Sequence, residues 1–514
     1  MFGHNSDSKP ESDGRASWGG SSEERPTTSK GFTRPTVLPT FLSTSFRKPL
    51  APGGRVTAAV VAAAALASIY TICCLPAGPT SRPSTVLGDS PFAHLVLDRP
   101  PLPQITRLAF NMVSAKWGFL WAARATAFVV SSPLHKTADA VYARNSLDAA
   151  KALQAWYDTS TGLWLSTGWW NSANCLTVLG DWALLDKANA VALGVASVMA
   201  NTYNNAQKTS VTTQKRLAAN GLVMAKYEFH RRAQKPGELD TRGFSGFIND
   251  FYDDEGWWAL ALIRSWDVTG QQGYLDMAEH IFEDMKNGTD QKCGGGIWWS
   301  KERAYKNAIA NELYLSVAAS LANRVPGNKD YYLGVAKAEW AWFKGSGMIN
   351  ANNLINDGLR INDDGSCVNN GQQTWSYNQG VVLGGLVELA RAMGDGSYLS
   401  EATAIAAAAL SALSDPTTSI IHETDHCEPN CGADGSQFKG IFVRNLHYLQ
   451  AAAPQNAFRS AINKNADSIW ANNRNELNQL GIDWAGPASA GGGPNATTHS
   501  SAMDVIVAAL AAAE

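Results

Sequence analysis

The sequence predicts an all-α fold in which paired helices close into a ring, preceded by a disordered tail and a single membrane-spanning helix. Across residues 138–514, apolar side chains recur at the three- and four-residue spacing of amphipathic helices. Loops rich in glycine and asparagine separate these segments, and neither alternating strands nor βαβ units stand out. About a dozen helices in consecutive pairs favour a closed ring of hairpins over a bundle. The loops of such a ring gather at one end, where a functional site is expected.

The N-terminal part predicts export with a retained anchor. Residues 1–54 are rich in Ser, Pro, Gly, Lys and Arg, so they form a disordered cytosolic tail. Residues 55–76 hold an uncharged stretch of about 20 residues, long enough to span a bilayer as a helix. Arg47, Lys48 and Arg55 precede this stretch, which keeps the N-terminus in the cytosol and exports the rest. A cleaved signal peptide is the alternative, but such peptides have a much shorter basic leader.

Residues 77–137 are predicted to be a stalk and N-terminal extension. Prolines are frequent in its first part, and an apolar, aromatic stretch covers 105–127. That stretch is either a first helix or a second membrane-associated segment. Arg107, Lys116 and Arg124 argue against a second span, because charged side chains are costly in a bilayer.

Each helix is expected where apolar residues repeat along one face. In 255–266, for example, Leu260, Ile263 and Trp266 fall on one side. In chain order, the predicted helices cover 140–156, 177–193, 213–233, 255–266, 273–285, 305–322, 330–343, 378–393, 398–411, 438–452, 456–470 and 501–512.

The charge balance excludes one class of partner. The chain has 42 basic and 45 acidic residues and a formal net charge of -3. A nucleic-acid-binding protein would need a basic stripe, so we expect no nucleic-acid partner, and a neutral polymer fits better. The 18 tryptophans suit either a helical core or a carbohydrate cleft.

Two adjacent acids, Asp253 and Asp254, are the strongest functional signal. They are followed by Trp257 and Trp258 and preceded by Tyr252. Paired carboxylates can supply the proton and the nucleophile of a sugar-cleaving reaction, and flat aromatic rings stack on sugar surfaces. The structural alternative is that an aspartate caps the helix that starts here. Capping accounts for one aspartate but not for the pair and its aromatic neighbours.

The position of the pair suggests a division of roles. A helix start favours an ionised carboxylate, so one aspartate can stay charged and attack the anomeric carbon. Its charge should raise the pKa of the second, which can then hold a proton near neutral pH. Neighbouring residues suit the separation of about 5–5.5 Å found in retaining glycosidases better than the wider inverting geometry. Glu255 is interpreted as helix N-terminal charge with a possible tuning role.

The chain resembles glycoside hydrolase family 76, the α-1,6-mannanase family, in its fungal form. The resemblance implies an (α/α)6 barrel, cleavage of α-1,6-mannosidic bonds with retention, Asp253 as nucleophile and Asp254 as acid/base. No metal or other cofactor is expected for such a glycosidase. The N-terminal anchor departs from the commoner secreted or lipid-anchored pattern. The matching segments are YDDEGWW at 252–258, CGGGIWW at 293–299, KNAIANE at 306–312, NDGL at 356–359, TWSYNQG at 374–380, FKGIFVR at 438–444 and SAMD at 501–504.

Other side chains in these segments are candidates for sugar binding. For the glycine-rich loop at 294–296, the alternative is a tight turn over a tryptophan-rich core. For Asn307, Asn311 and Glu312, the alternative to sugar binding is helix capping and loop anchoring. Lys439 and Arg444 either pair with carboxylates or are exposed. The predicted substrate-binding residues are Tyr252, Trp257, Trp258, Trp298, Trp299, Asn307, Asn311, Asp357, Tyr377, Asn378 and Gln379.

The cysteines are interpreted as lumenal. Their number is odd, so at least one should stay free. His422, His426, Cys427 and Cys431 are ligand types at a spacing that zinc could use, but in an oxidising compartment a small disulfide loop between the two cysteines is favoured. Cys367 is an alternative partner for either, and no metal is predicted. The lumenal cysteines are Cys175, Cys293, Cys367, Cys427 and Cys431.

The leading hypothesis is an endo-acting mannan α-1,6-mannosidase, or a related transglycosylase of fungal wall assembly. It would be a single-pass membrane glycoprotein with a lumenal or extracellular catalytic domain and sequons at Asn287 and Asn495. Asp504 and Glu514 interrupt the apolar C-terminus, so we expect no lipid-anchor signal there. The alternative is an inactive mannan-binding scaffold, which the intact acid pair disfavours. A polysaccharide lyase or uronyl hydrolase would need a more basic cleft.

Overall fold

The computed structural model describes residues 133–217, 223–231 and 246–513. The predicted tail, the membrane helix and residues 77–132 of the stalk lie outside the described residues. The chain divides into two units, 1–118 and 119–514, and every described residue belongs to the second. Among the described helices, none combines the length and the apolar character that crossing a bilayer requires.

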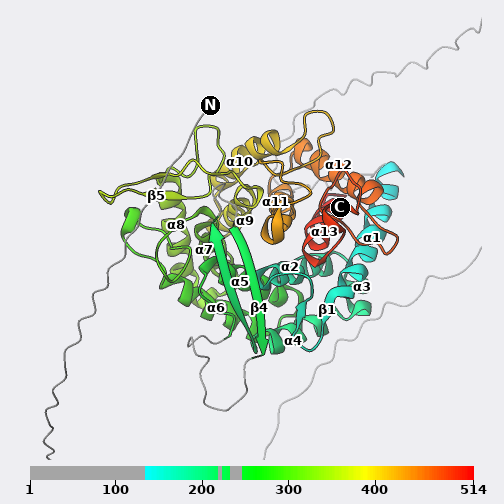
Figure 1. Cartoon of the computed structure of the whole chain (residues 1–514), viewed down its shortest axis with the longest axis horizontal. Helices are drawn as coiled ribbons and strands as arrows, with labels where there is room; N and C mark the ends of the chain where they lie inside the picture. The colour runs from blue at the N-terminus through cyan, green and yellow to red at the C-terminus, as the bar shows by residue number, and fades with distance from the viewer. Residues whose placement is uncertain (1–132, 218–222, 232–245, 514) are drawn as a thin grey trace, which may run out of the picture. The chain divides into compact units, whose positions relative to one another are not determined.

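Six helices form a closed inner ring, as Figure 1 shows from one end. Each packs against the next, and the last packs against the first. Their surfaces are buried nearly all round, which is why their sequences are apolar or small on every face. The inner helices are α2 (Trp169–Leu185), α5 (Tyr252–Thr269), α7 (Ala308–Arg324), α9 (Ser376–Met393), α11 (Gly432–Ala452) and α13 (Ala496–Ala513).

The outer helices cover the ring and bury one face only. On α10, Ala402, Ile405, Ala406, Ala409 and Leu413 are buried, at the spacing of a single helical stripe. The outer helices are α1 (Pro133–Leu153), α3 (Lys187–Leu193), α4 (Val195–Ala206), α6 (Gln272–Lys286), α8 (Lys329–Gly345), α10 (Ser397–Leu413) and α12 (Asn456–Asn472). Short 3-10 turns lie at Gln154–Trp156, Lys292–Gly294, Pro326–Asn328 and Ala490–Gly492.

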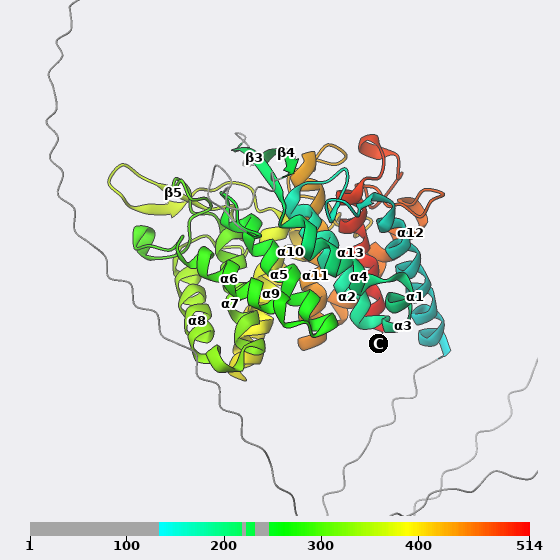
Figure 2. The ribbon, with the colours of Figure 1, turned by 90° about the horizontal axis from the view of Figure 1, so that it is seen from below.

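An outer helix intervenes between consecutive inner helices, so the inner helices run in one direction and begin at one end of the ring. The β-hairpins β3–β4 and β5–β6 lie at that end, opposite the C-terminus (Figure 2). The predicted gathering of loops at one end is therefore confirmed. The strands, all paired antiparallel, are β1 (Tyr157–Asp158), β2 (Leu163–Trp164), β3 (Thr209–Leu217), β4 (Val223–Arg231), β5 (Leu359–Ile361) and β6 (Cys367–Asn369).

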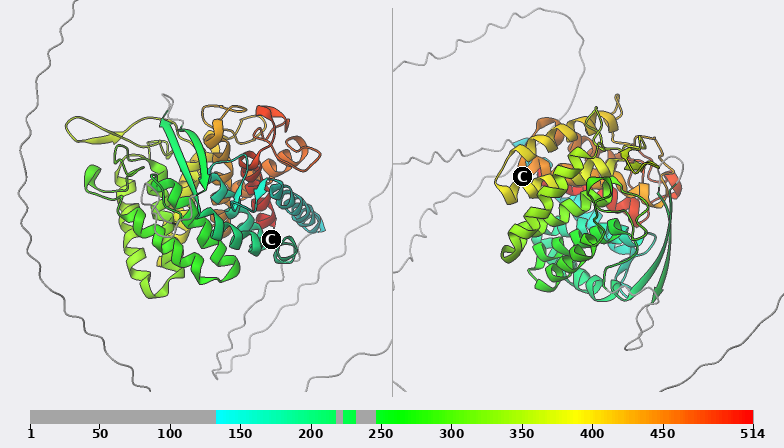
Figure 3. Two further views of the ribbon diagram at one scale, coloured as in Figure 1. Left: turned by 60° about the horizontal axis from the view of Figure 1, so that its bottom comes forward. Right: turned by 90° about the vertical axis from the view of Figure 1, so that its left-hand side faces the viewer.

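The helix predicted over 213–233 is wrong, because this segment forms the hairpin of β3 and β4. The register pairs Thr209 with Arg231 and Leu217 with Val223. Polar residues alternate there with β-branched and aromatic ones, and the pair Asn220-Gly221, typical of tight hairpin turns, stands between the strands in the sequence. Two views in Figure 3 show the hairpin at the loop end of the ring, and β4 contacts α11.

The helix predicted over 177–193 is two helices. The break falls at Asp186, whose carboxylate accepts the backbone N–H of Asn189 and so caps α3. Helix α4, which was not predicted, follows at once, because Gly194 adopts a left-handed conformation (φ 73°) that ends α3. The other predicted helices and the mostly helical fold are confirmed, with shifted ends; α11, for example, begins six residues before the predicted 438.

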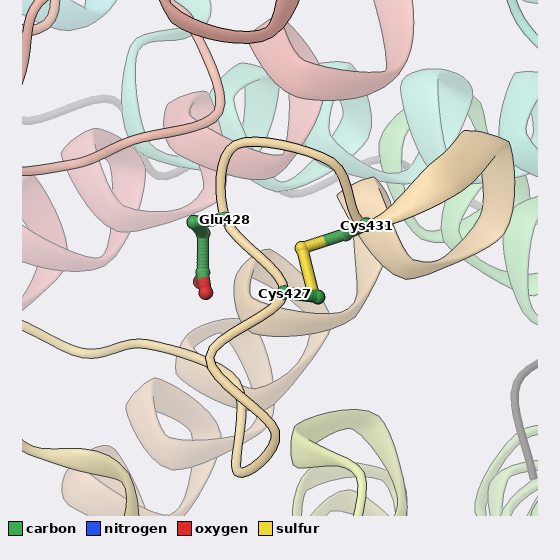
Figure 4. Close-up of side chains that lie close together, drawn as sticks. All are labelled: Cys427, Glu428 and Cys431. Carbon is green, nitrogen blue, oxygen red and sulfur yellow. A yellow bond between two sulfur atoms is a disulfide. The ribbon is translucent and has the colours of Figure 1, made fainter. Parts of the chain in front are cut away.

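Two disulfides form in the described residues. Cys427 forms a disulfide with Cys431, as predicted, and this bond closes a small loop directly before α11 (Figure 4). Cys293 pairs with Cys367, so the suggestion that Cys367 pairs with Cys427 or Cys431 is wrong. Cys175 is free and buried, in agreement with the odd number of cysteines.

Candidate active site

Asp253 and Asp254 lie in the first turn of α5, which begins at Tyr252. They are within the helix rather than at its cap, because Phe251 is the residue before the helix. Asp253 keeps 7% of its surface exposed, whereas Asp254 is fully buried. The side-chain amide of Asn249 donates to Asp254 Oδ2 at 2.7 Å. Both acids are therefore buried, and Asp253 alone keeps a small exposed surface.

The loop at 297–301 holds this turn in place. The Tyr252 N–H donates to the carbonyl of Trp299 at 3.0 Å. Glu255 is fully buried, and Lys301 Nζ lies 2.8 Å from its Oε1. Burial raises the pKa of Glu255 well above its ordinary value, although Lys301 opposes the rise. Glu255 therefore joins α5 to the loop and does more than add charge to the helix start.

Asp357 lies close to Asp253. It is buried, and the Tyr305 hydroxyl donates to its Oδ2 at 2.5 Å. Asn370 in turn donates to the Tyr305 hydroxyl at 2.8 Å. Burial raises the pKa of Asp357 to about 7, the bond from Tyr305 opposes the rise, and the charge of Asp253 adds to it. The structure thus brings two of the predicted site acids into one electrostatic cluster.

Glu312 and Tyr377 complete this cluster from α7 and α9. Glu312 is fully buried, and neither of its carboxylate oxygens has a hydrogen-bond partner among the described residues. Burial and then the charge of Asp357 raise its pKa well above the ordinary value. The pKa of Tyr377 is also raised, by burial and then by the charges of Asp357 and Asp253. Asp357 and Glu312 therefore hold their protons to higher pH than ordinary carboxyl groups do.

A pH dependence follows from Asp357. Its pKa rises from 3.8 to about 7 on folding, so its contribution to stability is complete below pH 3.8 and is lost as the pH rises through 7. Asp357→Asn removes this titration. We expect the melting temperature of the variant, relative to the parent, to increase between about pH 4 and about pH 8. Thermal unfolding across this range checks the expectation, and a difference independent of pH would contradict it.

Several of the aromatic candidates pack against other residues. Trp258 is fully buried between Trp169 and Phe247, at ring-centroid distances of 5.5 and 4.6 Å, so its ring lies in the core. Tyr252 is buried against Gly288, where even a Cβ atom would lie 2.5 Å from the tyrosine ring. It too belongs to the core.

Three further aromatic rings have different surroundings. Trp298 is buried and donates from its indole nitrogen to Asp290 at 2.6 Å, which fixes it in the loop. Trp257 is buried and stacks on Trp170 at 5.5 Å, one helical turn after Asp253. Trp299 is partly exposed. Of the five aromatic candidates outside α9, Trp299 is the most exposed, and Trp257 lines a cavity of about 340 Å³ between the inner helices.

The predicted amide contacts are mostly loop anchors. Asn307 accepts the N–H of Ala310 and caps α7. Asn311 binds both the N–H and the carbonyl of Ile297, at 2.7 and 3.0 Å. Gln379 binds the N–H and the carbonyl of Ile355 in the same way, both at 2.8 Å. Loop backbone thus occupies both polar atoms of the Asn311 and Gln379 side chains, whereas the side-chain oxygen of Asn307 caps its own helix.

Asn378 is different from its neighbour in the chain. It is fully buried, and neither atom of its side-chain amide has a partner in the described parts of the chain. It therefore remains a candidate for binding, together with Asp357 and Tyr377.

Sequence reasoning missed two groups that shape the site. Lys306 is fully buried, and its ammonium donates to Asp290 and to the carbonyls of residues 292, 295 and 296 at 2.7–3.0 Å. It thereby holds the glycine-rich loop. Asp434, in the first turn of α11, accepts the indole N–H of Trp170 at 2.9 Å. The position of Asp434 in the first turn of a helix is a sequence signal that could have identified it. Lys306 carries no comparable signal.

The basic residues left open by the sequence both pair with carboxylates. Lys439 lies 2.6 Å from Glu428, and Arg444 lies 2.7 Å from Asp504. Cys427, Glu428 and Cys431 form the one group of three metal-ligand types found in the described part of the chain. Figure 4 shows that the two sulfur atoms are bonded to each other, so they are not thiolate ligands.

The chain is similar to known proteins in sequence and in structure. A family model described as glycosyl hydrolase family 76 matches residues 194–514. The mannan endo-1,6-α-mannosidase DFG5 of Candida albicans is 31% identical over 219 residues, which are 40% of this chain and 47% of that protein. DFG5 of Saccharomyces cerevisiae is 32% identical over 219 residues, 39% and 46% of the two chains. The chain spans about half the length of the curated relatives it matches.

Solved structures share the fold. An inactive variant of the α-1,6-mannanase of Salegentibacter sp. HEL1_6, with two consecutive aspartates changed to asparagine and α-1,6-mannotriose bound, has a TM-score of 0.56 at 21% identity and covers 72% of this chain and 99% of that chain. Dfg5 from Chaetomium thermophilum in complex with glucosamine has a TM-score of 0.57 at 16% identity, covering 72% and 90%.

Proposed function

The chain belongs to glycosyl hydrolase family 76, and on this premise we propose that it is a retaining, endo-acting glycoside hydrolase that cleaves α-1,6-mannosidic bonds on an (α/α)6 barrel. The observation that carries the proposal is the pair Asp253–Asp254, at the loop end of the ring. Both members are buried: Asp253 keeps 7% of its surface exposed, and Asp254, which accepts a hydrogen bond from Asn249, keeps none. The solved relative whose inactivity accompanies the loss of two consecutive aspartates supports these roles.

The reaction would use both acids twice. In the first step, a carboxylate oxygen of Asp253 forms a bond to the anomeric carbon while the bond to the glycosidic oxygen breaks, and Asp254 gives its proton to that oxygen. In the second step, Asp254 takes a proton from water, whose oxygen displaces Asp253 from the anomeric carbon. Asp253 keeps the small exposed surface of the pair, and the raised pKa values of Asp357 and Glu312 limit competing negative charge near it.

A second outcome of the intermediate is transglycosylation. If a sugar hydroxyl replaces water in the second step, the same residues transfer the mannosyl group instead of hydrolysing it. This reaction in fungal wall assembly belongs to the proposal, on the strength of the DFG5 likeness. The runner-up is an inactive mannan-binding scaffold. Asp357 and Glu312 beside the pair favour an enzyme, because a binding module gains nothing from several buried acids.

The proposed organisation is a tail at 1–54, an anchor at 55–76, a stalk and extension at 77–137, and the catalytic domain at 138–514. With this order the catalytic domain is lumenal or extracellular, on a single-pass membrane glycoprotein. The two disulfides suit an oxidising compartment.

Incubation of the chain with linear α-1,6-mannan tests the proposal directly. Release of shorter α-1,6-linked oligosaccharides whose new reducing ends first appear with retained configuration is the expected result. Binding of mannan without any new reducing end would favour the scaffold. Products lengthened beyond the added acceptor would indicate transfer.

A further inference from the structure

A groove of about 610 Å³ lies where α2, α11 and α13 begin, at the same end of the ring as Asp253. Its described lining contains no charged side chain. Hydroxyl groups, amides and backbone predominate, which suits a neutral, hydroxyl-rich ligand better than an ion. The polar residues on its walls include Ser166, Thr167, Asn430, Ser436 and Asn495.

The groove lies beside α2, the helix that packs against the helix of the acid pair. Trp257, one turn after Asp253, stacks on Trp170 in the first turn of α2, and the groove residue Gly168 directly precedes that helix. The Trp170 indole donates to Asp434, which follows the groove residue Ala433 in the first turn of α11. The start of α2 therefore contacts both the groove and the helix that carries the acids.

One wall of the groove is the loop that Cys427 and Cys431 close (Figure 4). Glu428 in this loop is paired with the buried Lys439 at 2.6 Å. Gly491 supports the loop from the opposite side: a Cβ atom there would lie 2.4 Å from the carbonyl oxygen of Pro429. The wall is thus fixed by a covalent bond, an ion pair and a close backbone contact, and it needs no ordering when a ligand binds.

We propose that this groove is an additional sugar subsite, which binds a neutral hexose unit of the substrate chain beyond those at the acid pair. The proposal rests on the proposed function and adds a consequence to it. Binding energy gained in the groove is available to long chains only, so the enzyme distinguishes long α-1,6-mannan chains from short ones. An anionic ligand is not favoured, because no lysine or arginine lines the described walls.

Ala433→Phe tests the subsite by filling it. Ala433 is the exposed second residue of α11, so the new ring should occupy the groove without disturbing the core. Ala457→Phe is the matched control, because Ala457 is the exposed second residue of the outer helix α12. The measurement is kcat/KM on α-1,6-linked mannose oligosaccharides of increasing length. We expect Ala433→Phe to lower kcat/KM about tenfold more on the longest than on the shortest cleaved substrate, and Ala457→Phe to keep the parent's length dependence.

A second measurement is independent of turnover. Calorimetry with Asp253→Asn protein should show that Ala433→Phe weakens binding of a long oligosaccharide, whereas Ala457→Phe does not. If Ala433→Phe and Ala457→Phe showed the same dependence of kcat/KM on substrate length, or the same affinity for the long oligosaccharide, the subsite proposal would be overturned. The proposed function would not be affected by that result. A parent chain that neither cleaves nor binds α-1,6-linked mannose would overturn the proposed function, and the subsite with it.

Discussion

Asp253→Asn is expected to lower kcat on α-1,6-mannan by roughly ten-thousand-fold or more, since an amide cannot form the covalent intermediate. The loss should appear in kcat and leave substrate binding measurable by calorimetry. Asp363→Asn is the matched control, because Asp363-Asp364 is also an adjacent pair but lies exposed in the loop between β5 and β6. A normal rate in the Asp253 variant, or an equal loss in the control, would refute the role of Asp253.

Asp254→Asn separates the two acids. With a fluorinated mannosyl donor that carries a good leaving group, the first step no longer needs a proton donor, whereas the second still needs a base. The intermediate should therefore accumulate, and mass spectrometry should find the sugar on the peptide that contains Asp253. Label on a different carboxylate would reverse or refute the assignment.

Arg444→Leu is expected to have the largest effect on stability. Arg444 of α11 is buried and binds both carboxylate oxygens of the buried Asp504 at 2.7 and 2.8 Å, and it also donates to Asn174. Its removal leaves an unpaired acid between α11 and α13, which should cost about 3–5 kcal/mol in the free energy of unfolding. Chemical denaturation measures this loss.

Two further variants make the comparison specific. Arg391→Leu breaks a pair with Glu388 in which the arginine side chain is 63% exposed, so it should cost about 0–1 kcal/mol. The double variant Arg444→Leu, Asp504→Leu should recover much of the loss, because Asp504 no longer remains as an unpaired buried acid. If the Arg391 and Arg444 variants were equally destabilised, the account of the buried pair would be wrong.

The periodic parts of the structure could be predicted from the sequence, and the hairpin could not. Helices with a clear apolar repeat are predictable, because burial of one helix face sets the spacing of apolar residues along the sequence. The spacing of apolar residues predicts a helix over 213–233, but residues 209–217 and 223–231 pair as strands, as the turn signal Asn220-Gly221 indicates. Local pattern alone could not decide between the two readings.

The sequence points to the acids of the candidate site more clearly than to the roles of its amides. Asp253 and Asp254 stand out because two adjacent carboxylates are flanked by aromatic residues, whereas Asp357 is suggested by the family resemblance. Asn311 and Gln379 look equally suitable for binding sugar, yet both polar atoms of each side-chain amide bind loop backbone, at Ile297 and Ile355 respectively. The contact of Trp170 with Asp434 joins residues 264 positions apart, so it depends on ring closure, which no local pattern reveals.

Ring closure also bears on how the protein is made. Helix α2 has α5 on one side and α13 on the other, and α13 comes last among the described helices. During synthesis, one flank of α2 therefore stays uncovered until nearly the whole domain has left the ribosome. The apolar surface of α2 must be shielded for that interval, and the domain gains its final stability only after translation rather than stepwise along the chain.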